Sequence, residues 1–207
     1  MKVRTEARRD AIVAAASGLF QEMGYERASM NELAKRLSGS KATLYGYFPS
    51  KEALFVAVVR ASSTSHLSEA VEELTGEVTS LAELEAMLFR FAQRMLLVLT
   101  NDKSAIAVYR MVVAEAGHSE VGELFRAAGP LEATAALSHV LSSAMKRGEL
   151  RKADPELTAS QFTSLVIAET NSRILERDPK PMTIAQIRKI AKRATDFFFN
   201  AMRPAGD

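Results

Sequence analysis

The chain has 207 residues, and its 47% hydrophobic and 25% charged residues are the proportions of a folded globular protein rather than a disordered one. The lack of cysteine excludes disulfide scaffolds, thiolate metal sites and cysteine nucleophiles. The formal net charge of +2 does not indicate a uniformly basic nucleic-acid binder. No apolar run reaches the ~18 residues of a membrane span, and the N-terminal residues lack a signal-peptide core. We therefore expect a cytoplasmic protein that does not enter a membrane.

Apolar residues recur at intervals of three and four along the chain without sustained alternation, so the sequence predicts an all-α protein of about nine helices. The first helix is expected over Glu6–Met23 and ends at Gly24. Two short helices follow, the first capped by Ser29 and the second expected over residues 40–48 after a break at residues 38–40. A first helix followed by two short ones predicts a helix-turn-helix in the N-terminal part of the chain.

The later helices are expected to be longer, and capping residues such as Ser50, Asp154 and Thr183 mark their starts. Gly129-Pro130 is expected to interrupt one of them. The expected ranges are residues 51–74, 81–99, 102–116, 119–148, 156–176 and 184–202.

The second short helix carries polar side chains on its outer face. In a helix-turn-helix this helix enters the major groove, which is about 12 Å wide. There, lysine can bind guanine or phosphate, and hydroxyl groups suit phosphate oxygens. Lys51, at the start of the next helix, is also placed for a phosphate. The alternative is a small helical bundle with exposed polar residues, which gives no reason for two outward tyrosines on so short a helix. The outward residues are Ser40, Lys41, Thr43, Tyr45 and Tyr47.

Residues 40–55 read Ser-Lys-Ala-Thr-Leu-Tyr-Gly-Tyr-Phe-Pro-Ser-Lys-Glu-Ala-Leu-Phe and closely resemble the recognition segment of TetR/AcrR-family transcriptional regulators. Gly24-Tyr25 and Ala28-Ser29-Met30 also resemble that family, and the resemblance covers residues 7–58. It implies a homodimer that binds a palindromic operator in double-stranded DNA, usually as a repressor. It also implies a DNA-binding domain over residues 1–50 and a helical ligand-binding and dimerisation domain over residues 51–207.

The resemblance further implies DNA contacts for individual residues. The family usually has a Gly-Val-Ser turn before the recognition helix, whereas this chain has its glycine one place later, at Gly39. The family often has glycine where this chain has Ala42, a side chain that can contact a thymine methyl group. The operator sequence is therefore left open. By resemblance, Ser29 and Asn31 contact phosphate or bases, Lys41, Ala42 and Thr43 approach bases, and Tyr45, Tyr47 and Lys51 hold the DNA backbone.

The last expected helix has an apolar seam with intervals of three and four residues, which is typical of closely packed helices. The helix before it is apolar nearly all round from Phe162 to Ala168. We assign both to a dimer interface, because helix-turn-helix dimers read two half-sites about one turn of DNA apart or a multiple of it. Packing of both helices inside one monomer is the alternative. The assigned residues are Phe162, Val166, Ile187, Ala191, Ala194 and Phe198.

The family resemblance implies a ligand pocket among the middle helices. Methionine and aromatic side chains there suit a small apolar or amphipathic effector, because methionine adapts its shape easily. Plain core packing is the alternative for each of them. The candidates are Met87, Phe91, Met95, Tyr109, Met111, Phe125, His139 and Met145.

Enzymatic activity is not expected, because His66, His118 and His139 are isolated and no glycine-rich nucleotide motif or complete catalytic motif occurs. No metal or cofactor is predicted. The leading hypothesis is a ligand-responsive repressor. The alternatives are a non-specific architectural DNA binder, and an enzyme or small-molecule-binding domain whose helix-turn-helix is vestigial.

Charge is distributed unevenly along the chain. Residues 1–60 contain ten Lys and Arg and six Asp and Glu, a net charge of +4, whereas residues 61–207 contain seventeen and nineteen, a net charge of −2. The near-neutral total therefore hides a basic N-terminal part. In a dimer, two such parts would present about +8 to DNA.

Overall fold

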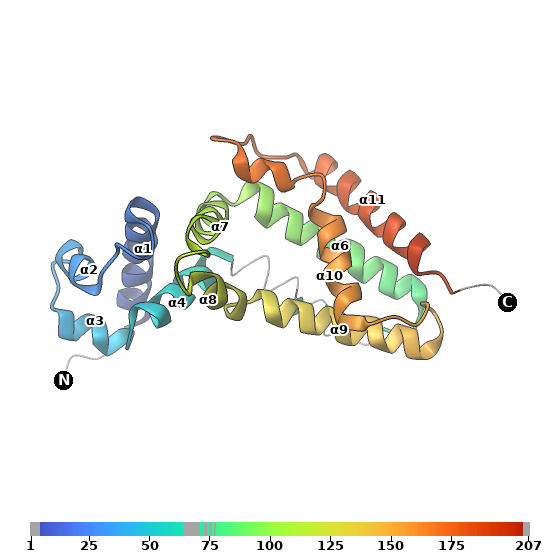
Figure 1. Cartoon of the computed structure of the whole chain (residues 1–207), viewed down its shortest axis with the longest axis horizontal. Coiled ribbons are helices and arrows are strands. Elements are labelled where there is room, and N and C mark those ends of the chain that lie inside the picture. The colour runs from blue at the N-terminus through green and yellow to red at the C-terminus, as the bar shows by residue number, and fades with distance from the viewer. Residues whose placement is uncertain (1–4, 64–70, 73, 75, 77, 205–207) are drawn as a thin grey trace. The chain divides into compact units, whose positions relative to one another are not determined.

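The structure is a computed structural model that describes residues 5–63, 71, 72, 74, 76 and 78–204. These residues form ten α-helices and one 3-10 helix and contain no β-strand, which confirms the predicted all-α class (Figure 1). The count exceeds the predicted nine because Gly129-Pro130 separates two helices rather than interrupting one. Within this part of the chain, no helix is both long enough and apolar enough to cross a membrane.

The helices follow one another with short connections in most of the described chain (Figure 1). In chain order they are α1 Glu6–Met23, α2 Met30–Arg36, α3 Lys41–Tyr47, α4 Lys51–Ser63, α6 Leu81–Asn101, α7 Lys103–Glu115, α8 Val121–Ala127, α9 Pro130–Arg147, α10 Pro155–Ile167, the 3-10 helix η1 Asn171–Leu175 and α11 Ile184–Met202.

Side-chain caps explain where several helices begin. Ser29 Oγ and Ser50 Oγ each accept a hydrogen bond from the backbone N–H three residues later, at 3.2 and 3.1 Å. At α11 the cap is reciprocal, because Thr183 Oγ1 accepts from Gln186 N (3.2 Å) and Gln186 Oε1 accepts from Thr183 N (2.8 Å). Each bond satisfies an amide that the first helical turn leaves without a partner. The predicted starts of these helices are confirmed.

The helix predicted over residues 156–176 is much shorter in the structure, and the helix predicted over residues 51–74 can be followed only in part. The helix predicted to reach Glu176 ends at Ile167, and η1 follows it. Thr170 Oγ1 donates to Ile167 O (3.2 Å), and the polar residues after Thr170 compete for backbone hydrogen bonds, which disfavours helix. α4 is described as far as Ser63, and most of the rest of its predicted range lies outside the described residues.

The first of two compact units comprises residues 1–62 and 107–130, and so contains α1 to α4, most of α7, and α8. Its apolar core includes an aromatic cluster. The Tyr25 ring lies 5.7 Å from the Phe20 ring and 5.1 Å from the Phe55 ring. Such ring pairs add to the stabilisation from apolar burial. The cluster therefore anchors the segment between α1 and α2 on α1 and α4.

The second unit comprises residues 63–106 and 131–207. Its core is formed mainly by α6, α9, α10 and α11. The Phe162 ring of α10 lies 5.0 Å from the Phe198 ring of α11 and 6.4 Å from the Phe91 ring of α6. The limits of the two compact units differ from the predicted boundary at residue 50 between a DNA-binding domain and a ligand-binding and dimerisation domain. That functional division stays a prediction.

Candidate nucleic-acid interface

The turn between α2 and α3 is made by Leu37, Ser38 and Gly39. Ser38 has a left-handed backbone conformation (φ 47°), and Gly39 N donates to Ala34 O (3.0 Å), which closes the end of α2. Arg8 Nη2 of α1 donates to Leu37 O (3.4 Å), and a Cβ on Gly39 would lie 3.2 Å from that nitrogen. Ser38 therefore takes the left-handed position, while the shifted glycine leaves room for Arg8.

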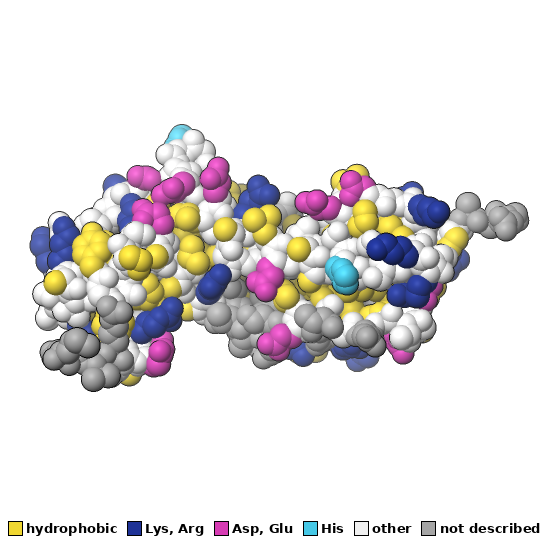
Figure 2. Space-filling view, turned by 90° about the horizontal axis from the view of Figure 1, so that it is seen from below, with side chains coloured by type: hydrophobic (Ala, Val, Ile, Leu, Met, Phe, Trp, Pro, Cys, Tyr) yellow, Lys and Arg dark blue, Asp and Glu magenta, His cyan; other side chains and the backbone are white. Residues whose placement is uncertain are grey.

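One face of α3 is held in the core by Leu44, which is 2% exposed, and the opposite face is open. Ser40 Oγ caps the helix by accepting from Thr43 N (3.1 Å), and the two hydroxyl groups share a second hydrogen bond (2.8 Å). Lys41 Nζ lies 5.8 Å from the centre of the Tyr45 ring, which is a cation–π distance. Figure 2 shows Lys and Arg side chains at the end of the first unit that holds α2 and α3. The exposed predicted residues are Ser29, Asn31, Ser40, Lys41, Ala42, Thr43 and Tyr45.

Tyr47 and Lys51, also predicted to hold DNA, are half-buried and have partners within the first unit. Tyr47 Oη accepts a hydrogen bond from Thr5 N (3.1 Å). Lys51 Nζ donates to Tyr25 O (3.1 Å) and lies 4.1 Å from the centre of the Tyr25 ring. These contacts join α3 and α4 to the segments before α1 and α2.

Tyr25 is a neutral anchor in this unit. Burial raises the pKa of its hydroxyl above the ordinary value, and the neighbouring carboxylates, Glu52 first among them, raise it further. The hydroxyl therefore keeps its proton and donates to Glu52 Oε1 (3.5 Å). A hydrogen bond from Ser50 lowers the pKa of Glu52, so the acceptor is a carboxylate.

The eight predicted pocket residues are divided between the two units. Tyr109, Met111 and Phe125 belong to the first, where the Tyr109 and Phe125 rings lie 5.8 Å apart. Four of the other five are packed in or against the core of the second unit, as the core-packing alternative supposes. Those five are Met87, Phe91, Met95, His139 and Met145.

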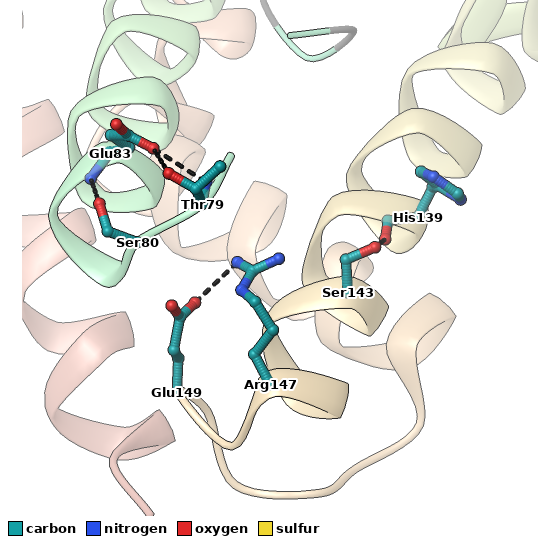
Figure 3. Close-up of polar contacts among 7 residues, drawn as sticks. All are labelled: Thr79, Ser80, Glu83, His139, Ser143, Arg147 and Glu149. Atoms are coloured by element: carbon teal, nitrogen blue, oxygen red, sulfur yellow. Dashed lines mark hydrogen bonds and ion pairs between the residues drawn. The ribbon is translucent and has the colours of Figure 1, made fainter. Parts of the chain in front are cut away.

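His139 differs from the other candidates because it is exposed on α9. Its backbone carbonyl accepts a hydrogen bond from a serine hydroxyl one turn later (3.1 Å; Figure 3). In the same view Arg147 Nη2 pairs with Glu149 Oε2 (2.7 Å), and the Glu83 carboxylate accepts two hydrogen bonds from Thr79 (2.8 and 2.9 Å). The His139 ring takes no part in the contacts drawn there.

The six residues assigned to the dimer seam are buried within the second unit. Phe162, Val166, Ile187, Ala191, Ala194 and Phe198 are each at most 7% exposed. This burial agrees with the alternative of packing inside one monomer, and their role in a dimer interface stays a prediction. Other apolar side chains lie on the outer side of α10 and α11. There, Leu157 and Phe197 are 56% and 64% exposed, and with Leu165 they border an open groove of about 530 Å³.

Two stretches of the chain match known protein families. Residues 12–58 match the bacterial regulatory proteins of the tetR family. Residues 86–204, more than half of the chain, match the C-terminal domain of AefR-like transcriptional repressors. The chain belongs to the TetR family. It is thus a transcriptional regulator with a DNA-binding helix-turn-helix, as the sequence predicted.

Solved structures of TetR-family proteins align with nearly the whole chain. The flavonoid-responsive regulator FrrA is 30% identical with a TM-score of 0.75, and the alignment covers 98% of this chain and 100% of FrrA. A TetR-family transcriptional regulator from Mesorhizobium loti MAFF303099 is 25% identical with a TM-score of 0.74, covering 97% of this chain and 100% of that one.

Curated relatives match over shorter stretches. The nucleoid occlusion factor SlmA of Mannheimia succiniciproducens is 34% identical over 79 residues, which are 37% of each chain. The transcriptional regulator RutR of Escherichia coli strain K12 is 41% identical over 54 residues, which are 26% of each chain. The aligned part of this TetR-family chain therefore spans 37% of the length of SlmA and 26% of the length of RutR.

Sequence reasoning missed one residue of this regulator's first unit. Glu115, the last residue of α7, accepts hydrogen bonds from Tyr25 N (2.7 Å) and Glu26 N (3.0 Å). Gly24 signals a tight turn at this place. Nothing in the sequence around Glu115 marks a partner 90 residues away.

Proposed function

We propose that this TetR-family regulator is a ligand-responsive repressor that binds a palindromic operator in double-stranded DNA as a homodimer and is released by a small apolar or amphipathic effector. The observation that carries the proposal is the row of exposed side chains on α3, on a helix that Leu44 fixes in the core. Lys41 can donate to guanine or phosphate, and the Thr43 hydroxyl can reach either. Ala42 presents a methyl group that fits the methyl of thymine.

Selection of bound sequences from a random duplex library tests the DNA-binding part. Because a two-fold dimer presents two copies of α3, we expect palindromic sequences with half-site centres about 34–36 Å apart or a multiple of that distance. Tyr45→Ala removes one hydroxyl contact per copy and should weaken binding to the selected sequence about tenfold. Equal affinity for all sequences would contradict the proposal and indicate a non-specific architectural binder.

We assign dimerisation to the outer face of α10 and α11. A cluster of exposed apolar side chains such as Leu157 and Phe197 is typical of a protein contact surface. Phe197→Glu places a charge there, and sedimentation should then show monomers. Leu175→Glu is the matched control, since Leu175 is 87% exposed on η1 and does not line the groove. A dimer that persists in Phe197→Glu argues against this assignment.

The effector is assigned to the second unit. Met87, Phe91 and Met145 share its core, and methionine side chains can rearrange around an apolar guest. Because FrrA is flavonoid-responsive, the flavonoid quercetin is the first probe and laurate is an amphipathic second. At least one should weaken binding to the selected DNA, since a ligand acts only through different affinities for two states. Unchanged DNA affinity with both would contradict the proposed effector class.

A further inference from the structure

The backbone between α1 and α2 is held from two sides by charged side chains. Glu115 Oε1 accepts from Tyr25 N (2.7 Å) and Glu115 Oε2 accepts from Glu26 N (3.0 Å). On the carbonyl side, Lys51 Nζ donates to Tyr25 O (3.1 Å) and Glu26 O (3.5 Å). The donors and acceptors of two consecutive residues are thus all bonded to charged groups, and charge-assisted hydrogen bonds are stronger than neutral ones.

Gly24, just before this segment, permits the close approach of the carboxylate. Its φ is 79°, a conformation that disfavours a side chain, and a Cβ there would lie 2.0 Å from Glu115 Oε1. Any other residue at this position would strain the backbone and also displace the carboxylate. The turn is therefore built around Glu115.

This segment leads directly into the helices that face DNA. Gly24 O accepts a hydrogen bond from Ala28 N (3.3 Å), and the next residue, Ser29, caps α2. Because the Tyr25 ring is packed in the aromatic cluster, the short backbone segment from Tyr25 to α2 has little conformational freedom. A displacement of Glu115 would therefore shift the backbone at the start of α2.

Glu115 also ends α7 and begins the turn to α8. Its carbonyl accepts hydrogen bonds from His118 N (2.9 Å) and Ser119 N (3.1 Å). The helix is continuous from Lys103 to Glu115, and a rigid helix can carry a displacement along its length.

We propose that Glu115 is a positioning residue for DNA binding. It ties the end of α7 to the backbone that sets where α2 begins, and so fixes the placement of α2 and α3 on the first unit. Lys51 holds the opposite side of the same segment and supports DNA binding through Tyr25 and Glu26. The inference rests on the proposed function, because it takes α2 and α3 as the DNA-contacting helices.

Glu115→Gln tests this role, because glutamine keeps the size of the side chain but has one acceptor oxygen and no charge. Glu123→Gln is the matched control, with the same charge change on an exposed side chain in the first turn of α8. Glu115→Gln should weaken binding to the selected DNA about 10- to 100-fold, the range for one charge-assisted bond. Amide exchange at Tyr25 and Glu26 should also become at least about tenfold faster. The control should change neither.

Discrimination of half-site spacing separates positioning from stability. We expect the wild type to lose affinity when one base pair is inserted at the centre of the palindrome, and Glu115→Gln, while still folded by circular dichroism, to discriminate much less. Weaker binding with an unchanged ratio between the two sites, or unchanged binding and exchange, overturns the proposal. If the wild-type protein selects no DNA sequence, that result contradicts the proposed function instead. Amide exchange at Tyr25 and Glu26 then still tests whether Glu115 holds this segment.

Discussion

Ser38 occupies a backbone position that favours glycine. Its φ of 47° brings the Cβ close to the following carbonyl, which costs roughly 1–2 kcal/mol. The neighbouring Gly39 is needed for a different reason, the close approach of Arg8. The sequence could show that the glycine is displaced from its usual place in the family. It could not show that Ser38 rather than Gly39 adopts the left-handed backbone conformation, because the place of Gly39 is set by Arg8 of α1.

Ser38→Gly should raise the free energy of unfolding by about 1 kcal/mol, because glycine adopts the left-handed conformation without a steric cost. Urea unfolding measures the change. Ser38→Ala is the control, since alanine keeps the Cβ and should not stabilise the protein. Equal stabilisation by both substitutions would show that the Cβ is not the source of the strain.

The family motif predicts the presence of Tyr47 and Lys51 but not the partners that they bind within the chain. Their identities follow from the family pattern, but their partners in the structure are the backbone at Thr5 and at Tyr25. Those partners lie 42 and 26 residues away, so no local pattern shows them. The exposed residues of α3 were easier to predict because the helical period alone places them opposite Leu44.

Among the elements, those whose ends are set locally could be predicted well. α1 begins and ends at the predicted residues, and α11 begins at the predicted capping box, because caps act over three or four residues. The end of α10 was missed because Thr170 and its neighbours bond to the local backbone instead of continuing the helix. The seam of α11 indicated close packing, but periodicity cannot tell whether the packed neighbour belongs to the same chain.

Thr183→Ala should lower the free energy of unfolding by about 1 kcal/mol, because it leaves an amide of the first turn of α11 without its acceptor. Asn101 of α6 bonds to both polar backbone groups of Met182, so the chain before the cap should stay in place. Thermal or urea unfolding measures the loss. Thr183→Ser keeps the oxygen and should lose much less. Equal losses would assign the effect to the methyl group rather than to the cap.

Across the whole molecule, the position of a charge should matter more for DNA binding than the total charge. The +4 of residues 1–60 includes Lys41, exposed on α3, whereas the rest of the chain has a net charge of −2. In that remainder, Lys192 of α11 is paired with Asp196 (2.7 Å). At physiological salt, charges separated by more than about 8 Å in solvent are largely screened. Only cations at the DNA surface should therefore release counterions.

Lys41→Gln and Lys192→Gln change the net charge equally, so a comparison of the two variants shows the effect of where the charge lies in the molecule. As a phosphate contact, Lys41 should contribute about 0.9 to the slope of log K against log salt for each copy, so its loss should flatten the slope of a dimer by about 2. Lys192→Gln should leave the slope unchanged. Binding to the selected DNA at several salt concentrations measures both. Equal flattening by the two variants would mean that total charge, and not the basic surface of α3, governs the association.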